Sequence, residues 1–370
     1  MRNNNVLGIV FSNMYDEVLP GLTAVRPMGS VPFAGRYRLI DFTLSNFVNS
    51  GISKVGIITR NNYQSLMDHI GSGKSWDLSR KNEGLYFLPP FTMSDELYAG
   101  RIASLIDIRP FFRNAREEYV ILSDCHVAGN IDINNIIKEH ISSGADITVA
   151  CRHGFAPPLK DNLIMWMNAE NRIIDIVLGQ HPAGECDYGV GLYLMRKDLM
   201  VGMLEAAASR NQMNFDRDIL LRHLGDVNIH GYRLPEHTSV ISSLGSYFKA
   251  NMALLNTNVL ESLFDPQRPI YTKVRDAAPA LYGLHASVSN SLVADGCFIE
   301  GRVHNSILFR DVRIARDAVV ENSIVMQGSV ICERTSLNYS VLDKDVVVKA
   351  GRVLSGAEDY PLFINKGTVV

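Results

Sequence analysis

The first two thirds of the chain alternate short apolar runs with segments of helical periodicity. The apolar runs have the length of buried strands and lie at residues 5–11, 54–60, 118–123 and 145–152. The segments between them repeat apolar residues every three to four positions, as amphipathic helices do, and lie at residues 41–53, 61–70 and 134–144. This alternation predicts an α/β domain with a mostly parallel sheet and helices on both faces. Such sheets bind ligands beyond the carboxyl ends of their strands, so phosphate chemistry is expected just after Phe11.

Beyond about residue 284 the helical period stops and a short phrase returns. In it, Asn or Tyr precedes a serine and branched aliphatics follow, with the serines at Ser291, Ser306, Ser323 and Ser340. Their spacings of 15, 17 and 17 residues are close to the roughly 18 residues of three hexapeptides, one triangular coil of a parallel β-helix. The end coils of such a stack have open strand edges, which favour pairing with another subunit.

These two textures divide the chain. We expect a first domain at residues 1–245, a linking helix and loop at 246–283 and the β-helix at 284–370. A chain of 370 residues with 46% hydrophobic residues is long enough to bury two cores.

Charge and cysteine content indicate which partners and which cellular location to expect. A net charge of −3 provides no field that would gather nucleic acid or anionic lipid. No run reaches the roughly 18 apolar residues of a membrane span. The five cysteines include no C-x-x-C pair and are odd in number, which favours reduced thiols. We therefore predict a soluble cytoplasmic protein without a nucleic-acid or membrane partner.

Several uninterrupted phrases resemble one family. VPFAGRYRLIDFTLSNFVNSGISKVGIITR (residues 31–60) and SLMDHIGSG (65–73) resemble the glucose-1-phosphate adenylyltransferases, or ADP-glucose pyrophosphorylases, of bacterial glycogen synthesis. EEYVIL, YGVGLYLM and SYFKANMALL follow in the family's order. The resemblance implies a Rossmann-like nucleotidyltransferase domain joined to a left-handed β-helix of hexapeptide type, assembled as a tetramer.

The family's phosphate-binding residues are missing from the matching positions. Where members have the loop G-G-x-G-T-R-L, this chain has NMYDEVL, so Asn13 and Asp16 stand for glycines and Val18 for the arginine. Met28 stands for a lysine. Glycines in such a loop let backbone N–H groups approach the triphosphate, whereas Asp16 and its neighbour Glu17 would repel it.

The positions implied for metal and sugar phosphate are altered as well. Cys125 and Val240 stand where the family has two metal-binding aspartates, and Gly179 stands for the sugar-phosphate lysine. Magnesium prefers oxygen ligands, so a thiol and a valine are poor substitutes. We expect no catalytic residue and no bound metal in this chain. The remnants of the substrate pocket would be Arg26, Tyr98, Gly100, Asp124 and Gly191.

With these losses, the chain resembles the non-catalytic companion subunit of the adenylyltransferase. This implies a chain inactive alone, which joins a Mg²⁺-dependent catalytic paralogue in a hetero-tetramer and changes its response to effectors. Two alternatives stay open. One is an independent sugar-1-phosphate nucleotidyltransferase that uses rearranged residues such as Asp124 with Arg26. The other is a binding protein that senses a sugar phosphate or nucleotide without chemistry.

Arginines are the candidates for an effector site, because guanidinium forks suit phosphates. They are Arg26, Arg36, Arg302, Arg310, Arg313 and Arg316. For the arginines of the β-helix, the alternative is exposed charge at its corners. For Arg26 and Arg36, the alternative is a structural pairing with Asp41 or with a helix C-terminus. Asp124, Cys125 and His126 could likewise form an altered metal site or simply fill the end of a strand.

Overall fold

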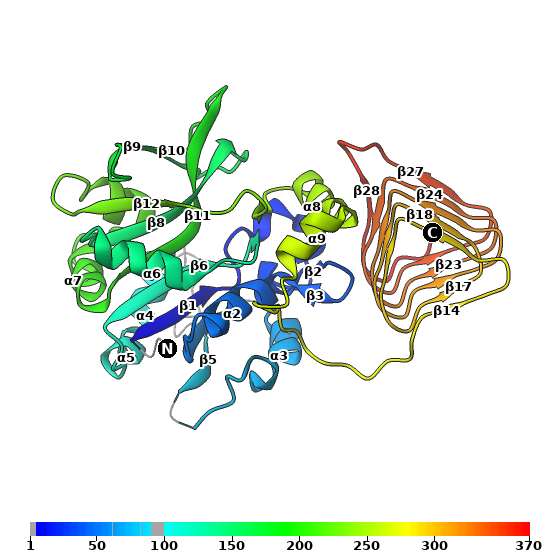
Figure 1. Ribbon diagram of the computed structural model, residues 1–370, viewed down its shortest axis with the longest axis horizontal. Helices are drawn as coiled ribbons and strands as arrows, with labels where there is room; N and C mark the ends of the chain where they lie inside the picture. Colours follow the sequence, from blue (N-terminus) through cyan, green and yellow to red (C-terminus); the bar gives the residue numbers. More distant parts are fainter. Residues whose placement is uncertain (1–4, 61, 82, 90–99) are drawn as a thin grey trace. The chain divides into compact units, whose positions relative to one another are not determined.

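The computed structural model describes residues 5–60, 62–81, 83–89 and 100–370. The chain divides into two compact units (Figure 1). The sheet unit comprises Met1–Met14, Phe42–Val240 and Gln267–Tyr271. The β-helix unit comprises Tyr15–Asp41, Ile241–Pro266 and Thr272–Val370. This division differs from the linear one expected from the sequence, because the segment after the first strand belongs with the β-helix.

The sheet unit is built on a nine-stranded mixed sheet of order β10-β9-β11-β6-β1-β4-β5, with β8 beside β11 and β12 beside β8. Its strands are β1 (Val6–Phe11), β4 (Lys54–Ile58), β5 (Gly84–Leu88), β6 (Tyr119–Asp124), β8 (Ile147–Phe155), β9 (Leu163–Met167), β10 (Ile173–Leu178), β11 (Glu185–Arg196) and β12 (Ile229–Arg233). The neighbours β5, β4, β1 and β6 are parallel, as predicted. However, β11 runs antiparallel to β6, β8 and β9, so the whole sheet is mixed.

The helices are α1 (Pro20–Thr23), α2 (Leu39–Asn49), α3 (Gln64–Ile70), α4 (Arg101–Asp107), α5 (Arg109–Arg113), α6 (Ile133–Ser142), α7 (Lys197–Ala208), α8 (Leu244–Met252) and α9 (Thr257–Leu263). Those predicted at 41–53, 61–70 and 134–144 are confirmed as α2, α3 and α6. The expected single linking helix is two helices, because Asn256 caps the start of α9 with its side chain.

Helices cover both faces of the sheet around β1. On one face, Leu7 and Ile9 share an apolar core with residues of α4, α5 and α7, among them Ile102. On the other face, Gly8 approaches α2 so closely that an added Cβ would stand 2.7 Å from the ring of Phe47. Because successive strand residues point to opposite faces, all six residues of β1 are buried. The carboxyl end of β1 is thereby held rigidly.

The repeat in the second half forms three parallel five-stranded sheets, the walls of a left-handed β-helix (Figure 1). The first has β14 (Leu281–Tyr282), β17 (Phe298–Ile299), β20 (Arg313–Ile314), β23 (Val330–Ile331) and β26 (Val347–Val348). The second has β15 (Ser287–Ser289), β18 (Arg302–His304), β21 (Val319–Glu321), β24 (Ser336–Asn338) and β27 (Val353–Ser355). The third has β16 (Leu292–Val293), β19 (Ile307–Leu308), β22 (Ile324–Val325), β25 (Ser340–Leu342) and β28 (Leu362–Ile364).

The recurring Asn-Ser phrase stitches successive coils together. Asn305 has a φ of 47°, a left-handed conformation that asparagine tolerates, and its amide donates to the Asn322 side chain at 2.6 Å. The serine that follows accepts the next coil's amide, as when the Ser323 N–H donates to Ser306 Oγ at 3.1 Å. Each phrase therefore fixes one corner and the register of the next coil.

The third wall of the β-helix is buried on its outer face. Leu308 belongs to the core of the coil, so the preceding Ile307 points outward, yet both side chains are 0% exposed. Gly35 lies over this wall, with an added Cβ standing 3.9 Å from Ile307. Gly21 likewise packs against the ring of Phe363. These contacts explain why residues 15–41 belong to the β-helix unit.

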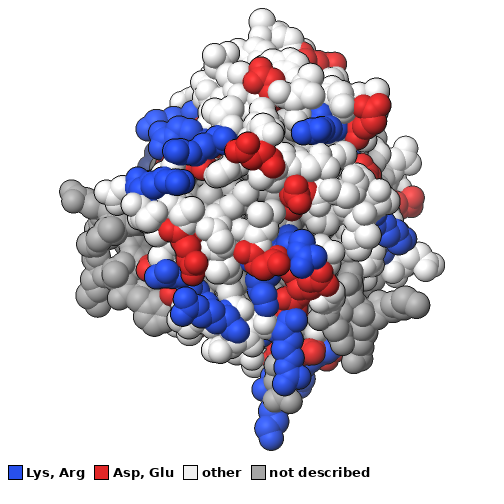
Figure 2. Space-filling model, turned by 90° about the vertical axis from the view of Figure 1, so that its left-hand side faces the viewer, with Lys and Arg blue, Asp and Glu red and all other residues white. Residues whose placement is uncertain are grey.

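Two further features bear on the setting of the protein. Within the described residues, no helix combines the length and apolar character needed to cross a membrane. Acidic side chains lie among the basic ones on the face shown in Figure 2, as a net charge of −3 would suggest. A cytoplasmic location without nucleic-acid partners stays a prediction.

Candidate functional site

After the end of β1, the side chain of Asn13 makes hydrogen bonds where the family has a glycine without a side chain. Asn13 accepts hydrogen bonds through Oδ1 from the Ser12 hydroxyl at 2.9 Å and from the Arg60 N–H at 2.8 Å. Arg60 follows β4, so this amide ties together the ends of two neighbouring strands.

The next segment uses its own backbone amides. After Tyr15, which has a φ of 66°, a short 3-10 turn over Asp16–Val18 leads into α1. The amides that donate to carbonyls within the segment are those of Val18, Leu19, Leu22, Thr23 and Ala24. A phosphate cradle requires such N–H groups to point at the ligand. Of the loop positions 13–19, Val18 and Leu19 have their amides bonded in this way, so these two N–H groups are not directed at a ligand.

Asp16 and Met28 stabilise one another. The Met28 N–H donates to Asp16 Oδ1 at 2.7 Å, and the Thr23 hydroxyl donates to the Asp16 carbonyl at 2.6 Å. The Met28 side chain is fully buried. The position of the family's lysine is thus a core position of the β-helix unit.

Arg26, the one basic residue retained from the family's pattern, is locked in an ion pair. Its Nη1 and Nη2 donate to Asp343 Oδ1 and Oδ2 at 2.7 and 2.9 Å, and the two side chains are 3% and 1% exposed. Arg26 thus has the structural pairing that was the alternative to anion binding, but its partner is Asp343 and not Asp41. Asp41 instead accepts the Arg38 N–H at 3.0 Å. Nor is Arg26 available to act with Asp124.

Cys125 and Val240, which stand at the positions of the family's metal-binding aspartates, lie near one another in the sheet unit but offer no side-chain oxygen ligand. Val240, in β13 (Ser239–Val240), pairs with Val127, in β7 (Val127–Ala128), two residues after Cys125. A buried thiol and an isopropyl group do not fit Mg²⁺, which prefers oxygen donors. Among the residues that the structure describes, no three His, Cys, Asp or Glu side chains are grouped to hold a metal ion.

The altered metal site proposed for Asp124, Cys125 and His126 is not formed either, because in the described part of the chain these three side chains are not grouped so that they could hold an ion. His126 is buried, and burial followed by the charge of Arg101 lowers its pKa to about 3. Its ring is therefore neutral at pH 7. Asp124, one residue before Cys125, has a different partner.

Asp124 ends β6 in a buried ionic network. Arg101, the first residue of α4, donates through Nη2 to Asp124 Oδ2, and its Nη1 lies 3.5 Å from Asp216 Oδ2. The Tyr193 hydroxyl donates to Asp216 Oδ1 at 2.7 Å. The guanidinium also lies over the rings of Tyr193 and Phe11, at 5.3 and 5.9 Å from their centroids. We call Arg101, Asp124, Asp216 and Tyr193 the Arg101 network.

Burial dominates the electrostatics of this network. It raises the pKa of Asp124 to about 6, although the Arg101 guanidinium lowers it. Gly191, in β11, makes room for the carboxylate: its φ is +71°, and an added Cβ would stand 1.9 Å from Asp124 Oδ2. The structure thus brings together two of the predicted remnants, Asp124 and Gly191.

The other remnants are placed less closely. Gly100 caps the start of α4, where an added Cβ would stand 2.5 Å from the Met213 carbonyl. Gly179 follows β10 with a φ of +68° and donates its N–H to the Asn162 carbonyl at 2.9 Å. Tyr98 lies outside the described residues. Sequence reasoning missed Arg101 and Asp216. For Arg101, the available signal was its charge within the apolar phrase GRIASLI.

Three of the effector candidates do not converge. Arg302 belongs to β18 in the second wall of the β-helix and Arg313 to β20 in the first, and both are exposed. Arg316 is also exposed and lies 3.9 Å from Asp317. Arg302, Arg313 and Arg316 therefore do not share the pocket suggested for them together with Arg310, because the coil turns them onto different faces.

A smaller set of cations does gather within the β-helix unit. Arg310 is 8% exposed, and burial followed by Arg36 and Arg275 lowers its pKa. Burial followed by Arg38 and Arg26 lowers the pKa of Lys344 to about 7, with Arg275 contributing. We call these residues the basic cluster: Arg36, Arg38, Arg275, Arg310 and Lys344. Of this cluster, sequence reasoning named Arg36 and Arg310. It missed Arg38, which lies in the quoted phrase GRYRLIDF, and it missed Lys344 and Arg275, which no motif marks.

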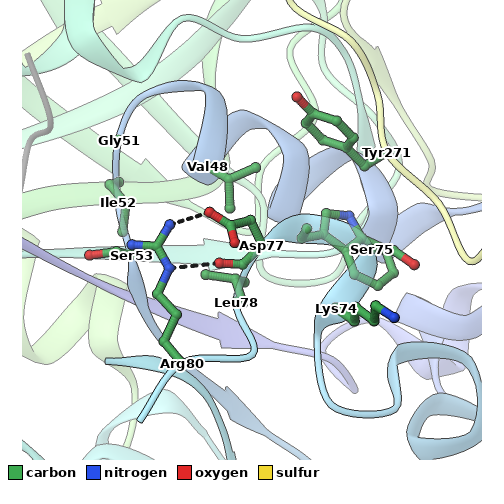
Figure 3. Close-up of a pocket in the computed structure, with 11 residues that line it drawn as sticks. Val48, Gly51, Ile52, Ser53, Lys74, Ser75, Asp77, Leu78, Arg80 and Tyr271 are labelled. Carbon is green, nitrogen blue, oxygen red and sulfur yellow. Dashed lines mark hydrogen bonds and ion pairs between the residues drawn. The ribbon is translucent and has the colours of Figure 1, made fainter. Parts of the chain in front are cut away.

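A hollow of about 350 Å³ opens elsewhere in the sheet unit (Figure 3). Val48, Ile52 and Leu78 line its apolar part, and Lys74 and Arg80 lie at its polar part. Arg80 Nε donates to the Asp77 carbonyl at 2.8 Å, so its guanidinium is already held. None of the degenerate family positions lines this hollow.

Comparisons with known proteins match both units of the chain. Residues 17–253 match the nucleotidyl transferase family, and residues 280–359 match the GlmU-like C-terminal hexapeptide family. Glycogen biosynthesis protein GlgD of Bacillus subtilis (strain 168) is 33% identical over 370 residues, which cover 100% of this chain and 98% of that protein. GlgD of Geobacillus stearothermophilus is 36% identical over 369 residues, covering 99% and 98%. Glucose-1-phosphate adenylyltransferase of Fervidobacterium nodosum is 29% identical over 352 residues, covering 94% and 85%.

Proposed function

The chain belongs to the GlgD family of glycogen biosynthesis proteins, within the nucleotidyl transferases, and on this premise we propose that it is a non-catalytic regulatory subunit. Its role lies in glycogen biosynthesis. Its partner would be a catalytic paralogue, a glucose-1-phosphate adenylyltransferase that makes ADP-glucose from ATP and glucose 1-phosphate with Mg²⁺. The two would assemble as a hetero-tetramer.

One observation carries the proposal. The charged groups left at the family's reaction positions are bonded inside the chain: Arg26 to Asp343, Asp16 to the Met28 N–H and Asp124 to Arg101. Losing one group that stabilises the transition state costs about a hundredfold to a thousandfold in rate. Because the amide loop, the lysine and both metal carboxylates are replaced together, the remaining activity would fall below detection.

The test is forward synthesis of ADP-glucose with Mg²⁺, measured for the chain alone, the paralogue alone and the two co-purified. We expect no turnover by the chain alone and a changed KM, kcat or effector response of the paralogue in the mixture. An unchanged paralogue would contradict a regulatory role. Turnover by the chain alone that disappears in Asp124→Ala would instead favour an independent nucleotidyltransferase.

The basic cluster is where we propose that an anionic effector binds. Five cations lie together there, and Asp343, which lies beside Lys344, is committed to Arg26. Asp295 and Asp311 offset part of the repulsion at Arg310, whose pKa is nevertheless lowered. Clustered and partly buried cations favour a bound phosphate or sugar phosphate, because the anion relieves their mutual repulsion.

Lys344 gives this proposal a pH dependence. Its pKa of about 7 in the folded protein lies below the pKa of a lysine in the unfolded chain. Below pH 7 the ammonium group is charged in both states, and its burial then lowers the stability of the folded state by the full amount. As the pH rises above 7 the folded protein loses this proton, and the loss of stability becomes smaller. A bound anion favours the charged form. We therefore expect sulfate to raise the midpoint of thermal unfolding more at pH 6 than at pH 9.

Lys344→Met is expected to abolish most of this pH difference, whereas Lys349→Met, which removes an exposed lysine of the same β-helix, should retain it. Scanning calorimetry with and without sodium sulfate at constant ionic strength measures both. An equal effect of sulfate at the two pH values in the unmodified chain would exclude Lys344 from the site.

A further inference from the structure

The Arg101 network places two buried carboxylates around one buried guanidinium. Two carboxylates, Asp124 and Asp216, face one guanidinium, and the three side chains are between 0% and 8% exposed. A pair of carboxylates directed at one point is the oxygen donor set that divalent cations prefer. Here the point between them is occupied by part of the chain.

We propose that Arg101 is the resident cation of this carboxylate pair, and that it occupies the place a divalent ion would take between Asp124 and Asp216. The proposal rests on the proposed function, because Asp124 is one of the remnants of the substrate pocket, and it adds that a cation of the chain itself lies against that carboxylate. A covalently attached cation cannot be exchanged or removed by a chelator.

Several contacts hold Arg101 in this place. Its guanidinium packs over the rings of Tyr193 and Phe11, which attract cations through their faces. The Tyr193 hydroxyl donates to Asp216 and so supplies part of the compensation for the second carboxylate. Gly191 leaves the space into which the Asp124 carboxylate reaches toward Arg101.

The same contacts exclude a second cation. A divalent ion between the carboxylates would meet the positive guanidinium within a few ångströms, in a medium where like charges repel more strongly than in water. Removing the guanidinium while leaving both carboxylates should reverse this preference. It leaves an uncompensated negative pair, which either takes up protons or binds a cation.

Manganese(II), whose paramagnetic signal reports binding directly, is the probe. We compare the full-length chain with Arg101→Ala, with Arg101→Lys, which keeps a cation, and with Arg101→Ala/Asp124→Asn, which removes a carboxylate as well. We expect Arg101→Ala to bind one Mn²⁺ per chain at least tenfold more tightly than the unmodified protein. Arg101→Lys and the double variant should bind no better than the unmodified protein.

Two outcomes would overturn the inference. One is Arg101→Ala that folds but binds Mn²⁺ no more tightly than the unmodified chain. The other is an unmodified chain that already binds one Mn²⁺ at a site lost in Asp124→Asn. If Arg101→Ala does not fold in EDTA, we expect Mn²⁺ to restore its folding. Failure to do so, with the double variant folded, also contradicts the inference.

The readout is metal binding and not turnover. ADP-glucose synthesis by the unmodified chain would overturn the proposed function whatever the manganese result, and a failed manganese experiment would leave the kinetic test of the subunit untouched.

Discussion

Replacing Asp343 by alanine is expected to lower the free energy of unfolding of the β-helix unit by about 3–5 kcal/mol, since it leaves the Arg26 charge buried without its partner. The two residues are 317 positions apart and join residues 15–41 to the β-helix, so their separation should loosen that whole segment. Urea denaturation followed by circular dichroism measures the loss.

An exposed ion pair of the same unit is the control. Lys249 and Asp359 also meet at 2.8 Å, but their side chains are 60% and 88% exposed. Because solvent screens exposed pairs, Asp359→Ala should leave the unfolding midpoint unchanged. The double variant Arg26→Met/Asp343→Leu should recover most of the loss, since apolar residues often replace a buried ion pair without cost. If Asp343→Ala lowered the free energy of unfolding as little as Asp359→Ala, the ion pair of Arg26 and Asp343 could not be shielded from water.

Gly191→Ala is expected to have a comparably large effect in the sheet unit. Its left-handed φ costs an alanine about 1–2 kcal/mol, and its Cβ would stand 1.9 Å from Asp124 Oδ2. The carboxylate must then move away from Arg101, and a disrupted buried pair adds up to about 3–5 kcal/mol. We expect the midpoint of thermal unfolding to fall by more than about ten degrees, and differential scanning fluorimetry measures this fall.

Gly202→Ala is the matched control. Gly202 lies in α7, where an added Cβ meets nothing within 4 Å. Alanine in a helix interior is favoured over glycine by about 0.5–1 kcal/mol, so this variant should be slightly more stable. A Gly191→Ala protein as stable as Gly202→Ala would show that the Asp124 carboxylate has room to move.

The parts of the fold that repeat along the chain were predictable. The Asn-Ser phrase predicted the β-helix because its residues repeat two roles from coil to coil: Asn305 adopts a corner conformation and bonds to Asn322, and Ser306 accepts the amide of Ser323. The alternation of strands and helices predicted β1, β4, β6 and β8. It did not predict the antiparallel β11, because a short apolar run looks the same in either direction.

The site was only half predictable. The glycines of the family's loop are replaced in the letters from Asn13 to Val18, so this departure from the family's pattern could be read without coordinates. The partners that the remaining charges adopt could not, because Arg26 meets Asp343 and Arg101 meets Asp216 across 317 and 115 residues. The spacing of residues along the chain does not indicate which of them meet across such long separations.

The bond between the Met28 N–H and the Asp16 carboxylate has a consequence for the protein's history. A return to glycine at position 16 would remove that acceptor, and with it part of the packing of residues 15–41, long before a nucleotide could be gripped. Under the proposed non-catalytic role, restoring the loop would therefore begin with a loss of stability. Lineages of such subunits are then expected to refine the partnership with the paralogue and not to regain turnover.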